Sequence, residues 1–341
     1  MGNSATLSEL ILNNLSTDCN ENPECRIVYE DNDLPYGINN FLFFIKPEIT
    51  LQSETKKTNS ILDLIFKQIS DFGLGIHDIR ILSAEYLEKY RIIEEHYGVI
   101  ASVSNNAKKS LSESAKVKFR EIYGLSIDET LFMGGDEFLI NYPFFNYHSL
   151  DCLWQNNENL KLASGTYCEK IRIDLDTVYL MNGFNPRQLK HFTKYGKCIV
   201  AFNLSGNISW SEARTSFIGA TNPNKAASGS LRRKLLDNKN EFGLSEVSQS
   251  YNGVHLSAGP VEALIELHRF DSDFSDPNGE HKYLEFPFGK KLAEAFGGKI
   301  PDDIINNANL SVEGKMTSVF DLTEEKNSDE AISLLYKYLN I

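Results

Sequence analysis

Residues 215–233 read T-S-F-I-G-A-T-N-P-N-K-A-A-S-G-S-L-R-R, and residues 252–270 read N-G-V-H-L-S-A-G-P-V-E-A-L-I-E-L-H-R-F. In the second segment, His255 ends a short apolar run, and a helical pattern with proline near its first turn follows. The first segment is a loop that carries Thr, Pro, Gly and two Arg. Together they predict a nucleophilic imidazole beside a cationic loop that binds anions.

Length and charge limit what the chain can do. It has 341 residues, 41% of them hydrophobic, which is enough for one large domain or two ordinary ones with a real core. The formal net charge of -13 argues against a surface for nucleic acid or anionic membranes. No apolar run approaches the length of a membrane span, and residues 1–18 lack the pattern of a secretory signal. An anionic ligand must therefore be bound by local cations.

Two features bear on location. The five cysteines are scattered, without a CxxC pair or zinc-ligand spacing, which indicates reduced thiols and a cytoplasmic protein. The start M-G-N-S-A-T fits the minimal N-myristoylation pattern, with Gly2 as the acceptor. The acidic segment that follows supplies no second membrane signal, so an ordinary N-terminus is the favoured interpretation and acylation the alternative.

The apolar pattern predicts strands and helices in alternation. Strands are expected at residues 41–47, 76–82, 197–203 and 253–255, and helices at 8–15, 58–72, 84–97, 185–194, 209–217 and 260–268. This order is that of a ferredoxin-like split βαβ fold, in which helices cover an antiparallel sheet, here with added helices. We therefore predict an α+β fold of this type.

Changes in composition divide the chain into parts. These are an N-terminal extension (1–39), a main domain (40–270) interrupted by an insertion (98–183), and a C-terminal extension (271–341). The insertion is polar and rich in Asn and Ser, with helices expected at 113–123 and 151–156 and a strand at 171–180. Residues 18–40 are expected to be irregular, and the chain is expected to end in an amphipathic helix at 328–339.

Several short motifs resemble those of the nucleoside diphosphate kinase family. In chain order they are F-I-K-P-E (44–48), E-E-H-Y (94–97), F-N-P-R-Q-L (184–189), K-Y-G-K-C-I-V-A-F (194–202), G-A-T-N-P (219–223), S-G-S-L-R (228–232) and N-G-V-H-L-S-A (252–258). The last is similar to the N-x-V-H-G-S-D motif around that family's active-site histidine. Each motif is weak alone, but their order and their spacing around His255 make the resemblance specific over 40–99 and 183–270.

The resemblance implies a ping-pong enzyme that moves the γ-phosphoryl of a nucleoside triphosphate, such as ATP, to a nucleoside diphosphate through a phosphohistidine, with Mg²⁺ on the phosphates. It implies that His255 is the nucleophile and that Glu266 and Ser257 orient it. The residues that it implies around the nucleotide are Lys46 and Tyr97 near the transferred phosphoryl, Thr221 and Arg232 on the phosphates, Asn252 on the sugar, and Phe184 on the base. The implied partners are small-molecule nucleotides, and a homo-oligomer is left open.

The chain also departs from the family pattern. The family's second arginine should fall at Thr215, whereas Arg214 lies one position earlier and would need a register shift to replace it. Leu256 and Ala258 stand where the family has Gly and Asp. The insertion falls where the family has a helical hairpin that closes one side of the nucleotide cleft. Base preference, acceptor and oligomeric state are therefore left open.

Two other functions stay open as alternatives. One keeps the fold and the phosphohistidine but uses a non-nucleotide acceptor, which the insertion and the L-S-A sequence after His255 favour. The other is a non-catalytic nucleotide-binding module, which the displaced arginine favours.

Overall fold

The computed structural model describes residues 4–16, 24–51, 54–156, 158–163 and 165–339. The chain forms two compact units, of which the first is Met1–Tyr90 with Tyr195–Ile341 and the second is Arg91–Lys194. The second unit contains the whole of the expected insertion, 98–183, and extends beyond it at both ends. Gly2 and Cys19 lie outside the described residues, and the other four cysteines are thiols.

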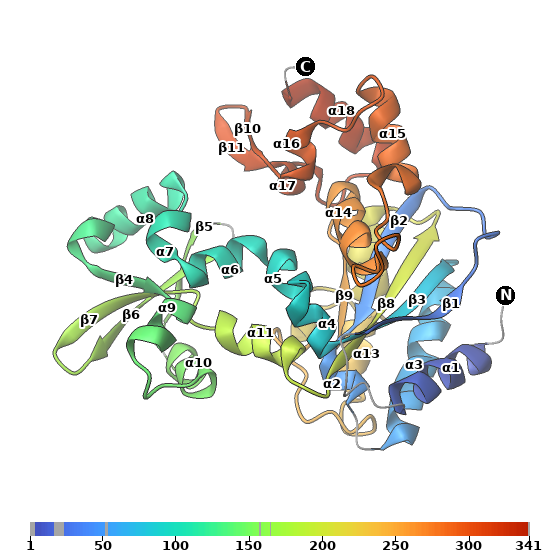
Figure 1. Ribbon diagram of the computed structural model, residues 1–341, viewed down its shortest axis with the longest axis horizontal. Helices are drawn as coiled ribbons and strands as arrows, with labels where there is room; N and C mark the ends of the chain where they lie inside the picture. Colours follow the sequence, from blue (N-terminus) through green and yellow to red (C-terminus); the bar gives the residue numbers. More distant parts are fainter. Residues whose placement is uncertain (1–3, 17–23, 52–53, 157, 164, 340–341) are drawn as a thin grey trace. The chain divides into compact units, whose positions relative to one another are not determined.

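The first unit is built on a five-stranded antiparallel sheet (Figure 1). In spatial order its strands are β1 (Cys25–Glu30), β3 (Gly75–Ser83), β8 (Cys198–Gly206), β2 (Asn39–Ile45) and β9 (Val254–Leu256). Every residue of β2 is buried, as the apolar run F-L-F-F-I leads one to expect for a central strand. The expectation that 18–40 is irregular was wrong for β1, an edge strand whose side chains are only half-buried and alternate weakly.

One face of this sheet carries the main hydrophobic core. Phe41, Phe43 and Ile45 of β2 belong to it and are fully buried. They pack with α3 (Thr55–Asp71), whose buried residues recur at helical spacing, and with α1 (Ser4–Ser16) and α13 (Leu231–Asp237). Burying a side chain of this size stabilises the fold by about 1.5–3 kcal/mol. Because strand register follows the buried face, this core fixes which residues of β2 point the other way.

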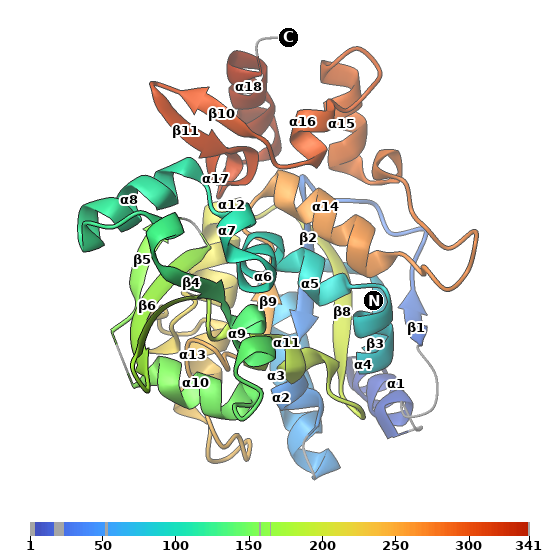
Figure 2. The same ribbon diagram turned by 60° about the vertical axis from the view of Figure 1, so that its left-hand side comes forward.

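The opposite face is covered by α14 (Pro260–Asp271), which lies across β2 in Figures 1 and 2. Its first residue is proline, which fits the start of a helix because that position needs no N–H donor. Phe44 points to this face and stacks on Phe270, with the two ring centroids 5.3 Å apart. His255 of β9 pairs with Phe44 and therefore lies on the same face.

A buried ion cluster anchors α14 to the sheet. The Nε atom of Arg80 on β3 lies 3.0 Å from a carboxylate oxygen of Asp78 and 3.0 Å from one of Asp271, the last residue of α14. Burial, reinforced by Asp271, raises the pKa of Asp78. Breaking such a cluster by removing one partner costs about 3–5 kcal/mol, because a charge is then buried alone. The cluster therefore holds the helix that faces His255.

Short helices connect the strands of the first unit. They are α2 (Pro47–Thr50), α4 (Ala84–Lys89), α12 (Trp210–Glu212), the π-helical turn η2 (Ala213–Ile218) and the 3₁₀ turn η3 (Pro223–Lys225). The single helix expected at 84–97 is interrupted at Arg91, which has a φ of 54°. A non-glycine residue with positive φ does not continue a helix. The helix expected at 209–217 forms as α12 followed by η2.

The C-terminal part of the first unit is more structured than its sequence indicated. Its elements are η4 (Tyr283–Glu285), α15 (Pro287–Ala295), α16 (Asp302–Ile305), the hairpin β10 (Asn309–Val312) with β11 (Lys315–Ser318), α17 (Val319–Thr323) and α18 (Ser328–Tyr338). The terminal helix expected at 328–339 is α18. The hairpin was not predicted, because its strands have only four residues each.

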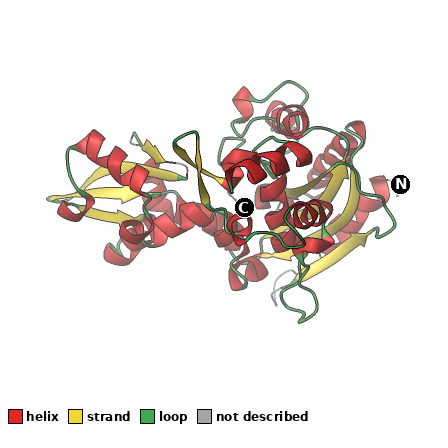
Figure 3. Ribbon diagram, turned by 90° about the horizontal axis from the view of Figure 1, so that it is seen from above, coloured by secondary structure: helices red, strands yellow, loops and turns green. Residues whose placement is uncertain are grey.

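The second unit has its own four-stranded sheet, drawn in yellow in Figure 3, in the order β4 (Leu131–Gly134), β7 (Asp176–Met181), β6 (Thr166–Ile173), β5 (Leu160–Ala163). Its helices are α5 (Ile92–His96), α6 (Gly98–Asn105), α7 (Ala107–Ser110), α8 (Glu113–Tyr123), η1 (Ile127–Glu129), α9 (Gly135–Asn141), α10 (Tyr147–Gln155) and α11 (Asn185–Thr193). The strand expected at 171–180 was wrong. Asp174 turns the chain with a φ of 51°, so this segment is a hairpin of β6 and β7.

The whole is a mixed α/β fold with antiparallel sheets and many helices; only β4, among the paired strands described, runs parallel to its neighbour. In the part of the chain that the structure describes, no helix has the length and apolar character needed to cross a membrane.

Candidate active site

His255 lies on the edge strand β9 and faces α14. Its Nε2 atom is 3.2 Å from each carboxylate oxygen of Glu266. The Glu266 side chain is 3% exposed and that of His255 16%. The imidazole also stacks on Phe44, with ring centroids 4.5 Å apart and an interplanar angle of 18°. An aromatic face and a buried carboxylate thus orient the ring, while part of it stays accessible to solvent.

The backbone before His255 requires a glycine. Gly253 has a φ of 79°, and a Cβ there would lie 2.7 Å from a side-chain atom of Leu235 and 2.8 Å from one of Ile49. Its N–H donates to Glu48 at 2.8 Å, and its carbonyl accepts from the backbone N–H of Lys46 at 2.9 Å. The N-G-V-H sequence therefore joins β9 to the start of α2, where Lys46 is the N-cap residue.

Lys46 is a buried cation, with 7% of the residue exposed. The pKa of its ammonium is lowered to about 8, chiefly by burial; Glu48 acts in the opposite direction, and Arg232 adds to the lowering. Among the described residues, none accepts a hydrogen bond from its Nζ. An anion that bound beside Lys46 would satisfy the ammonium and raise its pKa.

Arg232 is held by backbone carbonyls. From α13 its Nη1 donates to Gly219 at 2.9 Å and its Nη2 donates to Val254 at 3.0 Å. Gly219 has a φ of 87°, and a Cβ there would lie 2.3 Å from the hydroxyl of Ser230, so the loop can present this carbonyl only with glycine. Arg232 thus ties the loop after η2 to the strand that carries His255.

Asn252 and Thr221 lie at the same junction. The amide nitrogen of Asn252 donates to the carbonyls of Thr221 and Gln249, both at 3.1 Å. Asn252 is 1% exposed, and within the described chain its buried Oδ1 has no hydrogen-bond partner. Thr221 is exposed. Its carbonyl accepts the hydrogen bond from Asn252, and its side chain is accessible to a ligand.

Arg214 lies in the π-helical turn η2, which holds about one more residue per turn than an α-helix. Nη1 of Arg214 donates to the carbonyl of Leu256 at 3.1 Å, next to His255. Thr215 is exposed, and its hydroxyl donates to the carbonyl of Ser211. The structure thus places Arg214, and not position 215, beside the histidine strand.

Ser257 and Glu262 complete the surroundings. The Ser257 hydroxyl donates to the carbonyl of Leu42 and accepts from its N–H, so it joins β9 to β2 and acts on the imidazole only through the strand. Glu262, one turn before Glu266 on α14, was not predicted. Burial, followed by repulsion from Glu266, raises the pKa of its carboxyl. Its i, i+4 spacing from Glu266 was the only signal in the sequence, and such pairs are common on helices.

Two predicted residues, Tyr97 and Phe184, belong to the second unit and are described there. Tyr97 follows α5, and its ring centroid lies 6.3 Å from that of Phe192. Phe184 packs near Trp154 and Tyr167, with ring centroids 5.7 Å and 6.0 Å away. Phe184 is thus partly engaged in packing within its own unit.

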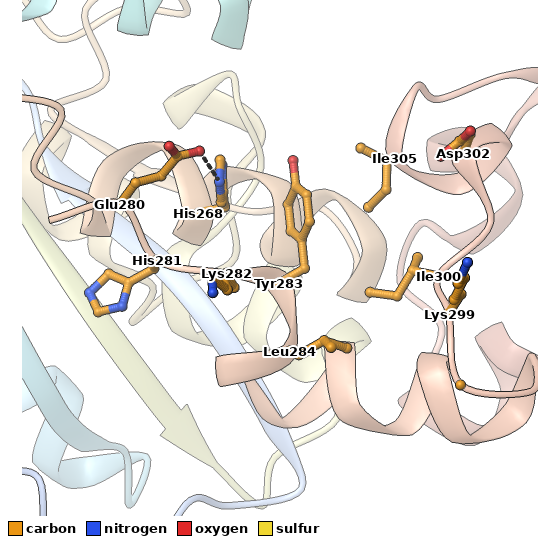
Figure 4. Close-up of a pocket in the computed structure, with 11 residues that line it drawn as sticks. His268, Glu280, His281, Lys282, Tyr283, Leu284, Lys299, Ile300, Asp302 and Ile305 are labelled. Carbon is orange, nitrogen blue, oxygen red and sulfur yellow. Dashed lines mark ion pairs between the residues drawn. The ribbon is translucent and has the colours of Figure 1, made fainter. Parts of the chain in front are cut away.

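A separate cavity of about 490 Å³ lies in the first unit near the end of α14 (Figure 4). In it Tyr283 stacks on His268 with ring centroids 4.4 Å apart, and His268 lies 3.3 Å from Glu280. Ile300 and Ile305 extend toward Tyr283. The residues that line this cavity differ from those predicted around His255.

Comparison with known proteins gives similarity at the level of structure. No protein-family model matches the sequence, and no curated protein does. The chain is similar to the apo nucleoside diphosphate kinase of Encephalitozoon cuniculi, with a TM-score of 0.33 and 14% identity over 72% of this chain and 96% of that one. It is also similar to the NDP kinase of Pyrobaculum aerophilum, with a TM-score of 0.36 and 18% identity over 73% of this chain and 100% of that one. At such scores and identities, activity has to be argued from the site itself.

Proposed function

We propose that the protein is a phosphotransferase that moves the γ-phosphoryl of a nucleoside triphosphate to a nucleoside diphosphate through a phosphorylated His255. The observation that carries the proposal is the contact of His255 Nε2 with the buried carboxylate of Glu266, at 3.2 Å. The strand order β9-β2-β8-β3, with helices between strands that follow in sequence, supports a ferredoxin-like split βαβ core for the first unit.

The carboxylate determines which ring nitrogen reacts. Since Nε2 faces Glu266, we assign its proton to Nε2 and the nucleophilic lone pair to Nδ1. Attack by Nδ1 forms the N–P bond while the bond from the γ-phosphorus to the bridging oxygen breaks, and the nucleoside diphosphate leaves with that electron pair. The ring becomes cationic, and the Glu266 carboxylate stabilises it through the Nε2–H. Transfer to a second nucleoside diphosphate reverses these changes.

The side chains of Lys46 and Arg214 and the loop that carries Thr221 bind the phosphates of the nucleotide. Lys46 is a buried ammonium without an acceptor among the described residues, and Arg214 lies beside the histidine strand. The hydroxyl of Thr221 is exposed on the loop that Arg232 holds in place. These groups fit a polyphosphate that extends from the loop toward His255.

Magnesium fits this site as a companion of the nucleotide. Mg²⁺ is bound mainly by phosphate oxygens and water in enzymes of this chemistry, and it supplies positive charge to the phosphates. As the pH approaches about 8, Lys46 is only partly protonated in the ligand-free protein, and Mg²⁺ would supply further positive charge to the phosphates. A cytoplasmic location and a homo-oligomer stay predictions.

One observation favours a second candidate, transfer to a non-nucleotide acceptor. Two nitrogens of Arg232 donate hydrogen bonds to the carbonyls of Gly219 and Val254. An arginine bound in this way holds the loop in place, and fewer of its N–H groups are left for the phosphates of a nucleotide. The same observation supports the non-catalytic module, in which nucleotide binds without transfer.

The test is incubation of the purified protein with γ-labelled ATP and Mg²⁺, followed by treatment of the labelled protein with acid and with base. We expect a label that is stable in base, lost in acid, and discharged by nucleoside diphosphates. His255→Ala should abolish it, whereas His148→Ala, at an exposed histidine of the second unit, should not. A label that ignores nucleoside diphosphates would favour another acceptor, and an active His255→Ala protein would refute the mechanism.

A further inference from the structure

The C-terminal extension reaches the strand that carries His255. After α17, the backbone N–H of Glu325 donates to the carbonyl of Ala258 at 2.9 Å. Gly259 packs so closely on the same segment that a Cβ there would lie 2.6 Å from the carbonyl oxygen of Thr323. Residues 323–325 are therefore fixed by backbone contacts just after the H-L-S sequence.

This segment brings a carboxylate to Arg214. The Nη2 atom of Arg214 lies 3.8 Å from Oε1 of Glu324, while Nη1 is bonded to the carbonyl of Leu256. Glu262 accepts from the N–H of Ala258 at 3.2 Å. Burial is the main cause that raises the pKa of Glu262, the positive charge of Arg214 lowers this pKa, and the negative charge of Glu324 adds to the rise. Arg214 thus interacts electrostatically with two carboxyl groups, one from α14 and one from the extension.

We propose that Glu324 is a specificity-determining residue, a carboxylate of the C-terminal extension that takes the place of an anionic ligand group on Arg214. The inference rests on the proposed function in one respect, that Arg214 binds a phosphate of the ligand. A polyphosphate that reaches Arg214 must displace Glu324 or lie next to it, and both are unfavourable. Repulsion of this kind lowers the affinity for highly charged ligands and so selects against them.

Burial sets the size of the effect. The Arg214 side chain is 20% exposed, whereas that of Glu324 is 47% exposed. Solvent therefore screens the carboxylate, and removing its charge should strengthen polyphosphate binding by roughly 2- to 5-fold at low salt. The gain should shrink as the ionic strength rises. The backbone contacts of residues 323–325 keep Glu324 close to Arg214, so the two charges already interact in the ligand-free protein.

The experiment measures binding of inorganic tripolyphosphate to the full chain by calorimetry, for the wild type, Glu324→Gln and Glu325→Gln. The two variants change the net charge equally, but at Glu325 it is the backbone that bonds to Ala258. We expect a roughly 2- to 5-fold lower Kd for Glu324→Gln and a change below about 1.5-fold for Glu325→Gln. In an Arg214→Gln background, Glu324→Gln should give no gain, because the pair no longer exists.

Phosphoenzyme formation from labelled ATP, measured on the same proteins, separates this inference from the proposed function. Equal affinity of Glu324→Gln and wild type, or a gain that persists without Arg214, overturns the role of Glu324 even where the wild type is phosphorylated. The expected pattern of affinities without any phosphohistidine supports Glu324 and refutes the kinase. If no variant binds tripolyphosphate, the role of Glu324 is refuted, and phosphoenzyme formation from ATP alone decides the proposed function.

Discussion

Replacing Glu266 by glutamine tests whether the carboxylate acts on the imidazole during phosphoryl transfer. Glutamine has nearly the same shape, and its carbonyl oxygen can still accept a hydrogen bond from Nε2 of His255. What it removes is the negative charge that stabilises the cationic ring. Since both carboxylate oxygens lie 3.2 Å from Nε2 and Glu266 is buried, the charge acts at short range with little screening.

The expected loss follows from the strength of such contacts. A hydrogen bond to a charged group is worth about 1.5–3 kcal/mol and a neutral one about half as much, so losing the charge costs about 0.75–1.5 kcal/mol. Since each 1.36 kcal/mol of barrier is about tenfold in rate, Glu266→Gln should slow phosphorylation of His255 by about 4- to 13-fold. The affinity for ATP should change little, because we assign no phosphate contact to Glu266.

The assay is single-turnover phosphorylation with γ-labelled ATP over a range of ATP concentrations, which separates the rate at saturation from the affinity. Glu280→Gln is the matched control, because Glu280 contacts His268, another histidine of the first unit, at 3.3 Å. It should leave both quantities unchanged. A wild-type rate in Glu266→Gln, or a loss confined to affinity, would contradict the assigned role of the carboxylate.

Two further predictions concern the neighbours of His255. Gly253→Ala should lower the free energy of unfolding by about 2–5 kcal/mol, since the new Cβ meets Leu235 and Ile49 at a positive φ, whereas Gly98→Ala, with open space around it, should change it little in denaturant titrations. Binding of Mg·ATP should weaken as the pH rises through about 8, because Lys46 then loses its proton in the ligand-free protein. Lys46→Arg stays charged and should bind equally at pH 7 and pH 9; a wild type whose affinity does not fall across this range would refute the assigned role.

The sequence predicted the central elements of the first unit where the apolar pattern was strong. The run at 41–47, the helical spacing at 58–72 and the pattern at 260–268 correspond to β2, α3 and α14 within about one turn. It failed where few residues are buried or where a single residue turns the chain. β1 is a half-buried edge strand, and Asp174 turns what read as one strand into a hairpin.

The candidate site shows the same limit in its residues. The motif around His255 pointed to Glu266, and the structure brings the two side chains together, although they are eleven positions apart. Glu324 carried no such signal, because its partner Arg214 is far away in the sequence and the contact depends on how the C-terminal extension packs on Gly259. Contacts of this kind arise only from tertiary packing.

Arg214 shows how a departure from a motif can be resolved by local geometry. Counted along the chain, the arginine falls one position before the expected one, which favoured a site that had lost its function. Arg214 lies in the π-helical turn at Ala213–Ile218, and such turns occur frequently at functional sites. In this turn a guanidinium, and not the hydroxyl of Thr215, faces the carbonyl of Leu256. We therefore expect Arg214, and not position 215, to supply the second cation that the resemblance implies, because its guanidinium lies beside the strand that carries His255.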